Sequence, residues 1–239
     1  MKPQISIIIP VYNHTGALTR ALASVAAQTY RPIEVIVVDD GSDIPLELSL
    51  PSAEPIDFHL IRQENAGAPA ARNAGFRASK GEYVIFWDAD VEADPTLLAQ
   101  MAGVLMEQPH ISFVYSNHTI VLHNNIKKSM PACTFDLHAL QENNYIHSTS
   151  LVRRGAVVTW DESLQRFQDW DFWLQIATAG GVGKWIDESL FTIVAKGTMS
   201  GWLPRCAYSP PWRWLPGIHA RVRAYEQAKA IVQKKYQVI

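Results

Sequence analysis

The sequence predicts an α/β protein whose sheet is mostly parallel and doubly wound. Two observations carry this prediction. Residues 5–9 and 34–38 are largely β-branched runs, as in strands that are buried on both faces. Between them, Leu18, Leu22 and Val25 recur at the spacing of one helix face. A strand, a helix and a strand in this order form a βαβ unit, which implies parallel pairing with a right-handed crossover.

The later elements continue this alternation. Asn13 or Thr15 is placed to cap the first helix, and Asp94 followed by Pro95 has the sequence of another helix start. Beyond residue 116 the alternation weakens, and residues 117–150 are polar without a clear period. The remaining expected elements are strands over 58–61, 83–87, 111–115, 183–186 and 190–194, helices over 69–79, 170–179 and about 216–236, and a loop over 43–55.

Composition excludes several classes of protein. The 239 residues are 48% hydrophobic and 18% charged, so the chain is neither disordered nor fibrous. The net charge of −2 disfavours a globally basic nucleic-acid binder, and no nucleic-acid partner is expected. Cys133 and Cys206 show no metal or redox spacing, which excludes a disulfide scaffold. Without a signal sequence or a run of about 18 apolar residues, we expect a cytoplasmic protein.

The last 38 residues differ in charge from the rest of the chain. Residues 202–239 carry a net charge of +6 against −8 elsewhere, together with Trp202, Trp212 and Trp214. Two interpretations stay open for this extension. Its helix packs on the acidic body and the tryptophans fill the join, or the extension makes a peripheral contact with the inner membrane face, because tryptophan and basic side chains favour the interface of an anionic bilayer.

Polar side chains follow three of the expected strands. Pro10 to Asn13 follow the first strand, Asp39 and Asp40 the second, and Asp88 and Asp90 the strand that ends at Trp87. Because the carboxyl ends of parallel strands meet at one edge, these residues predict an acidic crevice. Two carboxylates at positions i and i+2 of an extended chain point the same way, so both can bind one hard divalent ion, or one can bind the ion and the other a ribose hydroxyl. A solvated acidic turn is the alternative.

A loop rich in small residues, 64–75, precedes and enters the helix over 69–79. Close packing of that helix on the sheet explains its glycines and alanines. It does not explain Arg72 and Asn73. The guanidinium of Arg72 has the chemistry to contact a phosphate or a carboxylate, so we expect it to lie near a ligand.

Taken together, these segments resemble the family 2 glycosyltransferases. The resemblance lies in residues 6–13 (SIIIPVYN), 35–42 (VIVVDDGS), 65–67 (NAG) with 71–75 (ARNAG), and 81–90 (GEYVIFWDAD). Each motif alone is weak, but four in the same order are specific.

The resemblance implies a GT-A fold and an inverting transfer of a sugar from a nucleotide-diphosphate sugar. UDP is the commonest nucleotide in such families. The acceptor it implies is a saccharide or lipid-linked saccharide in surface polysaccharide assembly. It also implies Mg²⁺ or Mn²⁺, held by Asp90 and Asp88, which would neutralise the departing diphosphate. The donor-binding residues that it implies are Pro10, Val11, Tyr12, Asn13, Asp40, Arg72 and Asp88.

By the same resemblance, Asp169 in the segment QDWDFWL is the catalytic base. A helix start would help to keep its carboxylate ionised. The alternative for Asp169 is a helix N-cap without catalytic function. Gln168 stands where relatives carry an acid, and no histidine follows Val194, where Lys196 is either a substitute or a surface lysine.

These expectations divide the chain into a GT-A domain over 1–201 and an extension over 202–239. Within the domain, 1–115 would bind the nucleotide sugar and 116–201 the acceptor. Two other functions stay in view: an inactive nucleotide-sugar-binding subunit, and a sugar-nucleotide pyrophosphorylase. The second is disfavoured because no glycine-rich basic loop follows the first strand. His147 either contacts the acceptor or is a structural histidine.

Overall fold

The β-branched segments near the start of the chain form neighbouring parallel strands in the computed structural model, which describes residues 4–46, 56–122, 125–194, 210, 212–215 and 217–236. The strands are β1 (Ile5–Val11), β2 (Ile33–Asp39), β3 (Ile56–Arg62), β4 (Tyr83–Phe86), β5 (Val91–Ala93), β6 (Phe113–Val121), β7 (Lys127–Met130), β8 (Leu151–Arg153) and β9 (Gly183–Val194). The helices are α1 (Thr15–Ala26), α2 (Ala68–Ala78), α3 (Leu97–Glu107), α4 (Leu137–Glu142), α5 (Gln168–Thr178) and α6 (Ile218–Lys235), with short 3₁₀ turns at Arg154–Ala156 and Trp212–Trp214.

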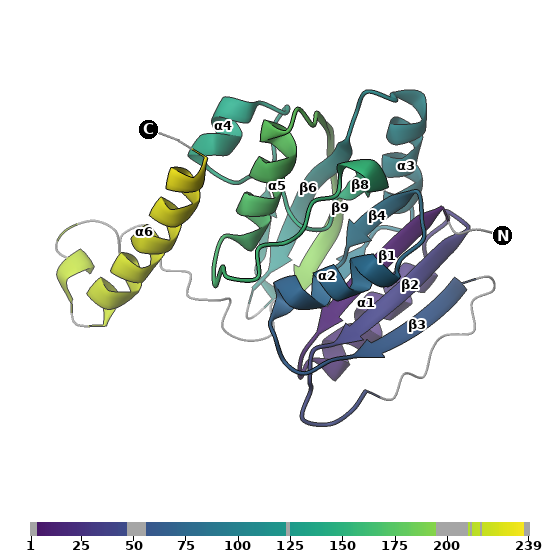
Figure 1. The fold of residues 1–239 in the computed structure, drawn as a ribbon, viewed down its shortest axis with the longest axis horizontal. Coiled ribbons are helices and arrows are strands. Elements are labelled where there is room, and N and C mark those ends of the chain that lie inside the picture. Colours follow the sequence, from purple (N-terminus) through teal and green to yellow (C-terminus); the bar gives the residue numbers. More distant parts are fainter. Residues whose placement is uncertain are drawn as a thin grey trace.

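The strands form one sheet in the order β3-β2-β1-β4-β8-β6-β9-β5, with β7 paired to β6 (Figure 1). The first four strands pair in parallel, with Ile5 opposite Ile33 of β2 and Tyr83 of β4. β8 is antiparallel to both its neighbours, β5 is antiparallel to β9, and β6 and β9 are parallel. The mixed α/β class with a mostly parallel sheet is therefore confirmed. Its parallel half brings the carboxyl ends of β1, β2 and β4 to one edge.

Apolar side chains of β1 face two buried cores, one on each side of the sheet. Ile7 belongs to the cluster that includes Leu18 of α1 and Met101 of α3. Ile8 belongs to the opposite cluster, with residues of α2 and α5. This alternation is the period of two that a strand buried on both faces requires. On the α2 side, a Cβ at Gly75 would lie only 2.4 Å from Ile8 Cγ2, so α2 packs closely because a side chain is missing there.

The second half of the chain is more regular than its sequence indicates. β6 extends to Val121, and β7 and α4 lie within the region 117–150 that was expected to lack a clear period. The two strands expected over 183–186 and 190–194 are one strand, β9, whose pairing shifts register opposite Ser116 and Asn117. The sequence did not predict β5 and β8, because three residues are too few to show a period.

The capping predictions for α1 and α3 are wrong. The N-cap of α1 is His14, whose side chain makes no capping hydrogen bond, rather than Asn13 or Thr15. The N-cap of α3 is Thr96, two residues after the predicted start at Asp94. The Asp94 carboxylate instead accepts hydrogen bonds from the backbone N–H of Thr96 at 2.8 Å and from its hydroxyl at 2.6 Å, which fixes the turn before the helix.

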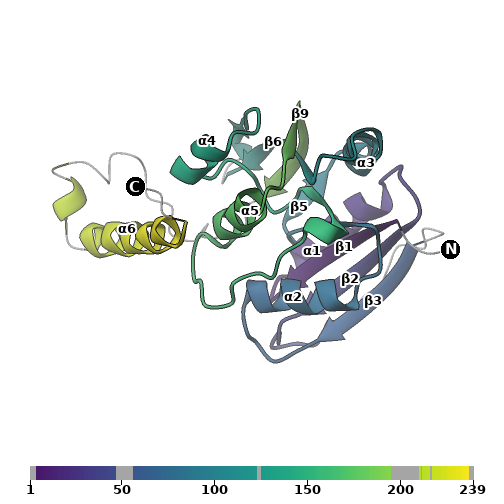
Figure 2. The same ribbon diagram turned by 45° about the horizontal axis from the view of Figure 1, so that its top comes forward.

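The C-terminal helix α6 lies beside α4 and α5, at the end of the molecule away from β3 (Figures 1 and 2). Its Val222 and Val232 are buried. Lys235 Nζ lies 2.9 Å from Asp161 Oδ2 and 2.8 Å from the buried Asp171 Oδ1, and the Tyr236 hydroxyl also donates to Asp171. The helix is therefore attached to the body by both apolar and ionic contacts.

The tryptophans of the extension do not all take part in this packing. Trp212 and Trp214 are 52% and 68% exposed, so they do not fill the join between helix and body. Trp202, Cys206 and Lys196 lie outside the described residues. Among the helices that the structure describes, none is long and apolar enough to cross a bilayer.

Candidate active site

A cleft opens where the carboxyl ends of β1, β2 and β4 meet the start of α2. It contains both predicted metal ligands, Asp88 and Asp90, and every predicted donor-binding residue except Asn13. Segments that are far apart in the sequence therefore meet at the edge where parallel strands end. The lining residues are Pro10, Val11, Tyr12, His14, Ala17, Asp40, Ala68, Arg72, Asp88, Ala89, Asp90 and Val194.

Arg72 is the buried cation of the cleft, with a relative exposure of 5%. Its Nη2 donates to Asp88 Oδ1 at 2.8 Å, and its guanidinium carbon lies 4.4 Å from the centre of the Trp160 ring. Burial works against the charged form, but the carboxylates of Asp88 and Asp169 outweigh it and raise the pKa of Arg72. Its Nε and Nη1 are buried and have no hydrogen-bond partner within the described residues. Arg72 thus keeps spare donors of the kind that bind a phosphate.

Asp88 and Asp90 differ in their surroundings although they are two residues apart. They lie in a turn closed by a 3.0 Å hydrogen bond from the Val91 N–H to the Asp88 carbonyl, not in the extended chain that was expected. Burial works against the charged form of Asp88, but Arg72, His147 and the hydroxyl of Ser148 outweigh it and lower the pKa of this carboxyl.

The pKa of Asp90 shifts in the opposite direction. Burial and the neighbouring charge of Asp88 raise the pKa of Asp90. Within the described residues, no lysine or arginine forms an ion pair with it. Asp90 therefore offers a carboxylate oxygen that fits a divalent cation, because it lies in an acidic cleft where His147 and His14 balance its charge only in part.

Asp40 lines the cleft, but its carboxylate also shapes the loop that precedes α2. Oδ1 accepts from the Ala66 N–H at 3.0 Å and Oδ2 from the Gly67 N–H at 2.9 Å. Asn13 lies outside the cleft lining and exchanges hydrogen bonds with Asp43, at 3.1 Å and 2.9 Å. Both residues therefore stabilise loops at the mouth of the cleft. This structural role would explain their presence even without a contact to a ligand.

Asp169 lies in the first turn of α5, and its carboxyl group interacts electrostatically with Arg72 and Asp88. The N-cap of α5 is Phe167, so the interpretation of Asp169 as an N-cap is wrong. Burial and the charge of Asp88 raise the pKa of Asp169, and Arg72 offsets this only in part. The net shift is opposite to the one that the helix N-terminus alone would give. Asp169 is therefore a carboxyl group that binds a proton more readily than an ordinary aspartate.

Ser148 and Trp160 lie next to Asp88 and Arg72, and the sequence did not indicate either of them as a binding or catalytic residue. Ser148 donates from its hydroxyl to Asp88 Oδ2 at 2.8 Å, and its backbone N–H acts to lower the pKa of Asp169. Trp160 lies under the guanidinium of Arg72. Both residues are in irregular segments near β8, where neither periodicity nor a motif could have indicated them.

His147 completes the network on the side of β6 and β9. Its Nδ1 accepts the Thr149 N–H at 3.0 Å, so in the neutral ring Nε2 carries the proton, 3.8 Å from Asp88 Oδ2. The ring packs on His118 and Phe191. Burial lowers the pKa of His118 to about 3, so His118 is neutral at ordinary pH. Of the two histidines, His147 is the one in reach of the carboxylates.

Comparison with known proteins identifies the family. A family model described as glycosyl transferase family 2 matches residues 6–157, which is more than half of the chain. The chain belongs to glycosyltransferase family 2. The matched region contains Arg72, Asp88 and Asp90, but it ends before Asp169.

Curated relatives of this family 2 chain carry the same general description. The uncharacterized glycosyltransferase YwdF of Bacillus subtilis is 29% identical over 187 residues, which cover 73% of this chain and 68% of YwdF. The uncharacterized glycosyltransferase YibD of Escherichia coli is 37% identical over 106 residues, covering 44% of this chain and 31% of YibD. The chain thus spans about two thirds of the first relative and about one third of the second.

Solved structures of S. aureus TarS have the same fold. The TarS fragment 1–349 in complex with UDP-GlcNAc superposes with a TM-score of 0.66 and 18% identity, covering 98% of this chain and 71% of the fragment. The fragment in complex with UDP gives a TM-score of 0.61. At such identities the likeness concerns the fold, and it confirms the predicted GT-A fold of this family 2 protein.

Proposed function

We propose that this protein is an inverting glycosyltransferase that takes its sugar from a nucleotide-diphosphate sugar, with UDP as the nucleotide. The observation that carries the proposal is the meeting of Arg72, Asp88 and Asp90 at one cleft, with Asp169 outside the cleft lining but interacting electrostatically with Arg72 and Asp88. UDP is the nucleotide because the TarS complexes of the same fold are described with UDP and UDP-GlcNAc.

In this proposal, the cleft residues hold the donor by its nucleotide end. Pro10, Val11 and Tyr12 line the base and ribose pocket, with Asn13 and Asp40 shaping its rim. Arg72 has two nitrogens without partners for the diphosphate. Asp88 is already bonded to Arg72 and Ser148, so it orients the guanidinium as well as the donor.

Asp90 is the residue that fits a metal ion best, with Asp88 beside it. The carboxylate of Asp90 is partly buried in an acidic cleft, and Mg²⁺ or Mn²⁺ prefers such oxygen ligands. When bound, the ion supplies positive charge that stabilises the leaving diphosphate.

Asp169 acts as the base in the proposed reaction. The acceptor hydroxyl loses its proton to the Asp169 carboxylate while the hydroxyl oxygen forms a bond to the anomeric carbon. The bond from that carbon to the diphosphate oxygen breaks, and its electron pair stays on the diphosphate. A single displacement of this kind inverts the anomeric carbon. The raised pKa of Asp169 supports this role, because a general base works best when its pKa is near the operating pH.

The acceptor we propose is a saccharide or lipid-linked saccharide at a cytoplasmic membrane surface. The support is the extension, where basic residues accompany the exposed Trp212 and Trp214. Exposed tryptophan and basic side chains together favour the interface of an anionic bilayer. In this arrangement the domain over 1–201 performs the transfer and residues 202–239 bring it to the lipid.

Calorimetric titration of UDP with and without Mn²⁺ tests the donor site. The wild-type protein should bind UDP more tightly with Mn²⁺, and Asp90→Ala should lose the metal-dependent part while its circular dichroism is unchanged. Glu107→Ala, at an exposed position at the end of α3, is the control and should behave as the wild type. Absence of UDP binding by the wild type contradicts the donor class, and unchanged Mn²⁺-dependent binding in Asp90→Ala contradicts the metal assignment.

A further inference from the structure

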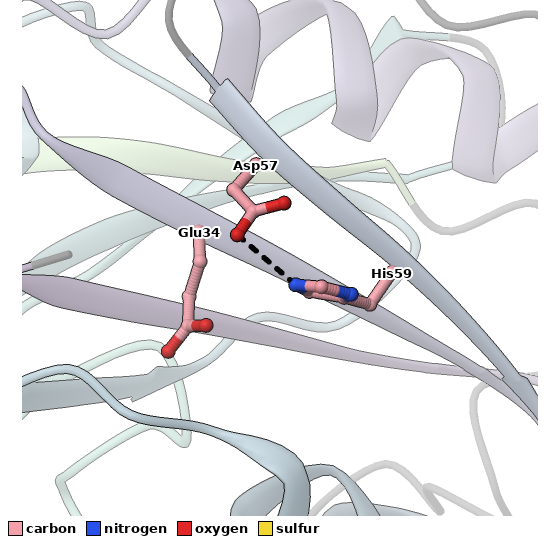
Figure 3. Close-up of side chains that lie close together, drawn as sticks. All are labelled: Glu34, Asp57 and His59. Carbon is pink, nitrogen blue, oxygen red and sulfur yellow. Dashed lines mark ion pairs between the residues drawn. The ribbon is translucent and has the colours of Figure 1, made fainter. Parts of the chain in front are cut away.

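Glu34, Asp57 and His59 lie together at the end of the strands opposite the cleft (Figure 3). Glu34, near the start of β2, is the register partner of Asp57 in β3. His59 follows two residues later and therefore points to the same face. One potential ligand atom of each residue lies within 4.8 Å of those of the other two.

Glu34 is fully buried, and only one of its two carboxylate oxygens has hydrogen-bond partners within the described residues. Its Oε1 accepts from the Ser6 hydroxyl at 2.5 Å, from the Lys80 N–H at 2.5 Å and from the Gly81 N–H at 3.0 Å. Its Oε2 is buried and has no hydrogen-bond partner within the described residues. A buried charged oxygen without a partner is costly, which indicates that something else binds there.

The two β3 residues, Asp57 and His59, add an imidazole nitrogen to the possible ligands and border solvent. His59 Nε2 is 3.2 Å from Asp57 Oδ2, within ion-pair distance, yet it has no hydrogen-bond partner in the described part of the chain. The side chains of Asp57 and His59 are 62% and 41% exposed, so both border solvent, while His59 Nε2 itself is buried.

Arg154 interacts electrostatically with Glu34 but does not bind its free carboxylate oxygen. Its guanidinium, however, donates to the Gly81 carbonyl and, at 2.7 Å, to the Ser79 hydroxyl. Arg154 therefore balances part of the Glu34 charge but leaves Oε2 without a bond.

We propose that Glu34, Asp57 and His59 bind a divalent transition-metal ion, and that Zn²⁺ is the best match. Zn²⁺ accepts both imidazole nitrogen and carboxylate oxygen as ligands in four-coordinate sites, and a water can fill the position that three protein ligands leave open. Mg²⁺ and Ca²⁺ prefer sites made of oxygen alone. The ion would fasten the edge strand β3 to β2 and, through the hydrogen bonds of Glu34 to Lys80 and Gly81, to the connection between α2 and β4.

The test is the addition of ZnCl₂ to the metal-free full chain, followed by calorimetry and thermal melting. We expect one tight site. Zinc at about 100 times its dissociation constant should increase the folding equilibrium constant about 100-fold and raise Tm by roughly 5–10 °C for a domain of this size. MgCl₂ at the same concentration should leave this site empty and have no comparable effect.

His59→Gln and Asp57→Asn are the informative variants, because their side chains are half-exposed and the fold does not depend on them as it does on Glu34. Each should weaken Zn²⁺ binding by more than about tenfold. His138→Gln, at an exposed position on α4, is the matched control and should bind Zn²⁺ as the wild type does. Absence of tight Zn²⁺ binding by the wild type, or binding that is unchanged in both variants, would overturn the proposal.

Asp90→Ala separates this site from the cleft. Zn²⁺ binding should persist in Asp90→Ala, since Asp90 lies at the opposite end of the strands. Its loss there would place the ion in the cleft and contradict the proposed site.

Discussion

Asp88 and Asp90 show how local surroundings give two similar side chains opposite pKa shifts. Arg72 and Ser148 compensate the charge of Asp88, whereas Asp90 keeps a raised pKa. The spacing in the sequence predicted that both carboxylates point the same way. The turn at Ala89 makes them different, and the difference depends on Arg72 and Ser148, which are distant in sequence.

Asp90→Asn should stabilise the protein in the absence of metal. The folded pKa of Asp90 is raised, so the native state binds a proton more readily than the unfolded chain, and the free energy of unfolding falls as pH rises above the unfolded pKa. A neutral amide removes this cost at pH 7. We expect Tm to increase by about 2–4 °C, the effect of 1 kcal/mol in a domain of this size. Thermal melts at pH 7 with EDTA measure it, and a lower Tm would contradict the charge balance described for the cleft.

The pH dependence of transfer should report the pKa of Asp169. The base must be deprotonated, so kcat/KM should fall as pH decreases through a pKa above the ordinary aspartate value of about 3.9. His118 cannot cause this loss because its pKa is about 3. The same acid limb should persist in His147→Gln, which removes the other histidine nearby. A rate that stays constant down to about pH 4 would show that no raised carboxyl is required.

At the scale of elements, the sequence was informative where a pattern was long enough to repeat. The runs in β1 and β2 and the helix face of Leu18, Leu22 and Val25 show clear periods, and the structure has these elements within one or two residues. β5 and β8 have three residues each, and nothing in so short a segment distinguishes a strand from a loop. Their strand geometry comes from pairing with β9 and β4 instead.

Residues of the active-site cleft also differ in whether the sequence could predict them. The strand-end residues from Pro10 to Asp90 could be predicted because the topology of a parallel sheet fixes where they lie. Trp160 and Ser148 could not, because their positions depend on irregular segments folding over α2. Asn73 shows the connection: its side chain holds the backbone of Trp160 by two hydrogen bonds, at 3.0 Å and 2.9 Å.

Lys235→Met tests the attachment of α6 to the body. Lys235 neutralises Asp171, a buried carboxylate, so its loss leaves a buried charge with fewer partners. We expect a loss of about 1–3 kcal/mol in the free energy of unfolding, measured by urea denaturation. Lys234→Met, one residue earlier at an exposed position, is the control and should stay within about 0.5 kcal/mol of the wild type. Equal stability of both variants would mean that this ion pair does not hold the helix.

At the scale of the whole molecule, we propose that the extension contacts a membrane while its helix stays attached to the body. We expect sedimentation with anionic vesicles at low salt and release at high salt, because each basic side chain near the surface contributes about 1 kcal/mol. Removal of residues 202–239 would also remove Lys235 from Asp171, so the exposed Trp212→Ala and Trp214→Ala pair is the cleaner variant. It should reduce sedimentation, and no sedimentation of the intact protein at low salt would exclude the membrane contact.

In the proposed mechanism, donor binding in the cleft and proton removal by Asp169 are separate functions. We propose that residues of the parallel half bind the nucleotide and that Asp169 of α5, from the second half of the chain, removes the acceptor proton. The two halves share one sheet, which keeps the base in place relative to Arg72 and Asp88.

Transfer from a UDP-sugar by the wild type and by Asp169→Asn tests this central claim most directly, with UDP affinity measured on the same samples. We predict that UDP affinity is nearly unchanged while transfer falls by about 10²-fold or more, the usual effect of losing a general base. Transfer at the wild-type rate in Asp169→Asn would contradict the claim.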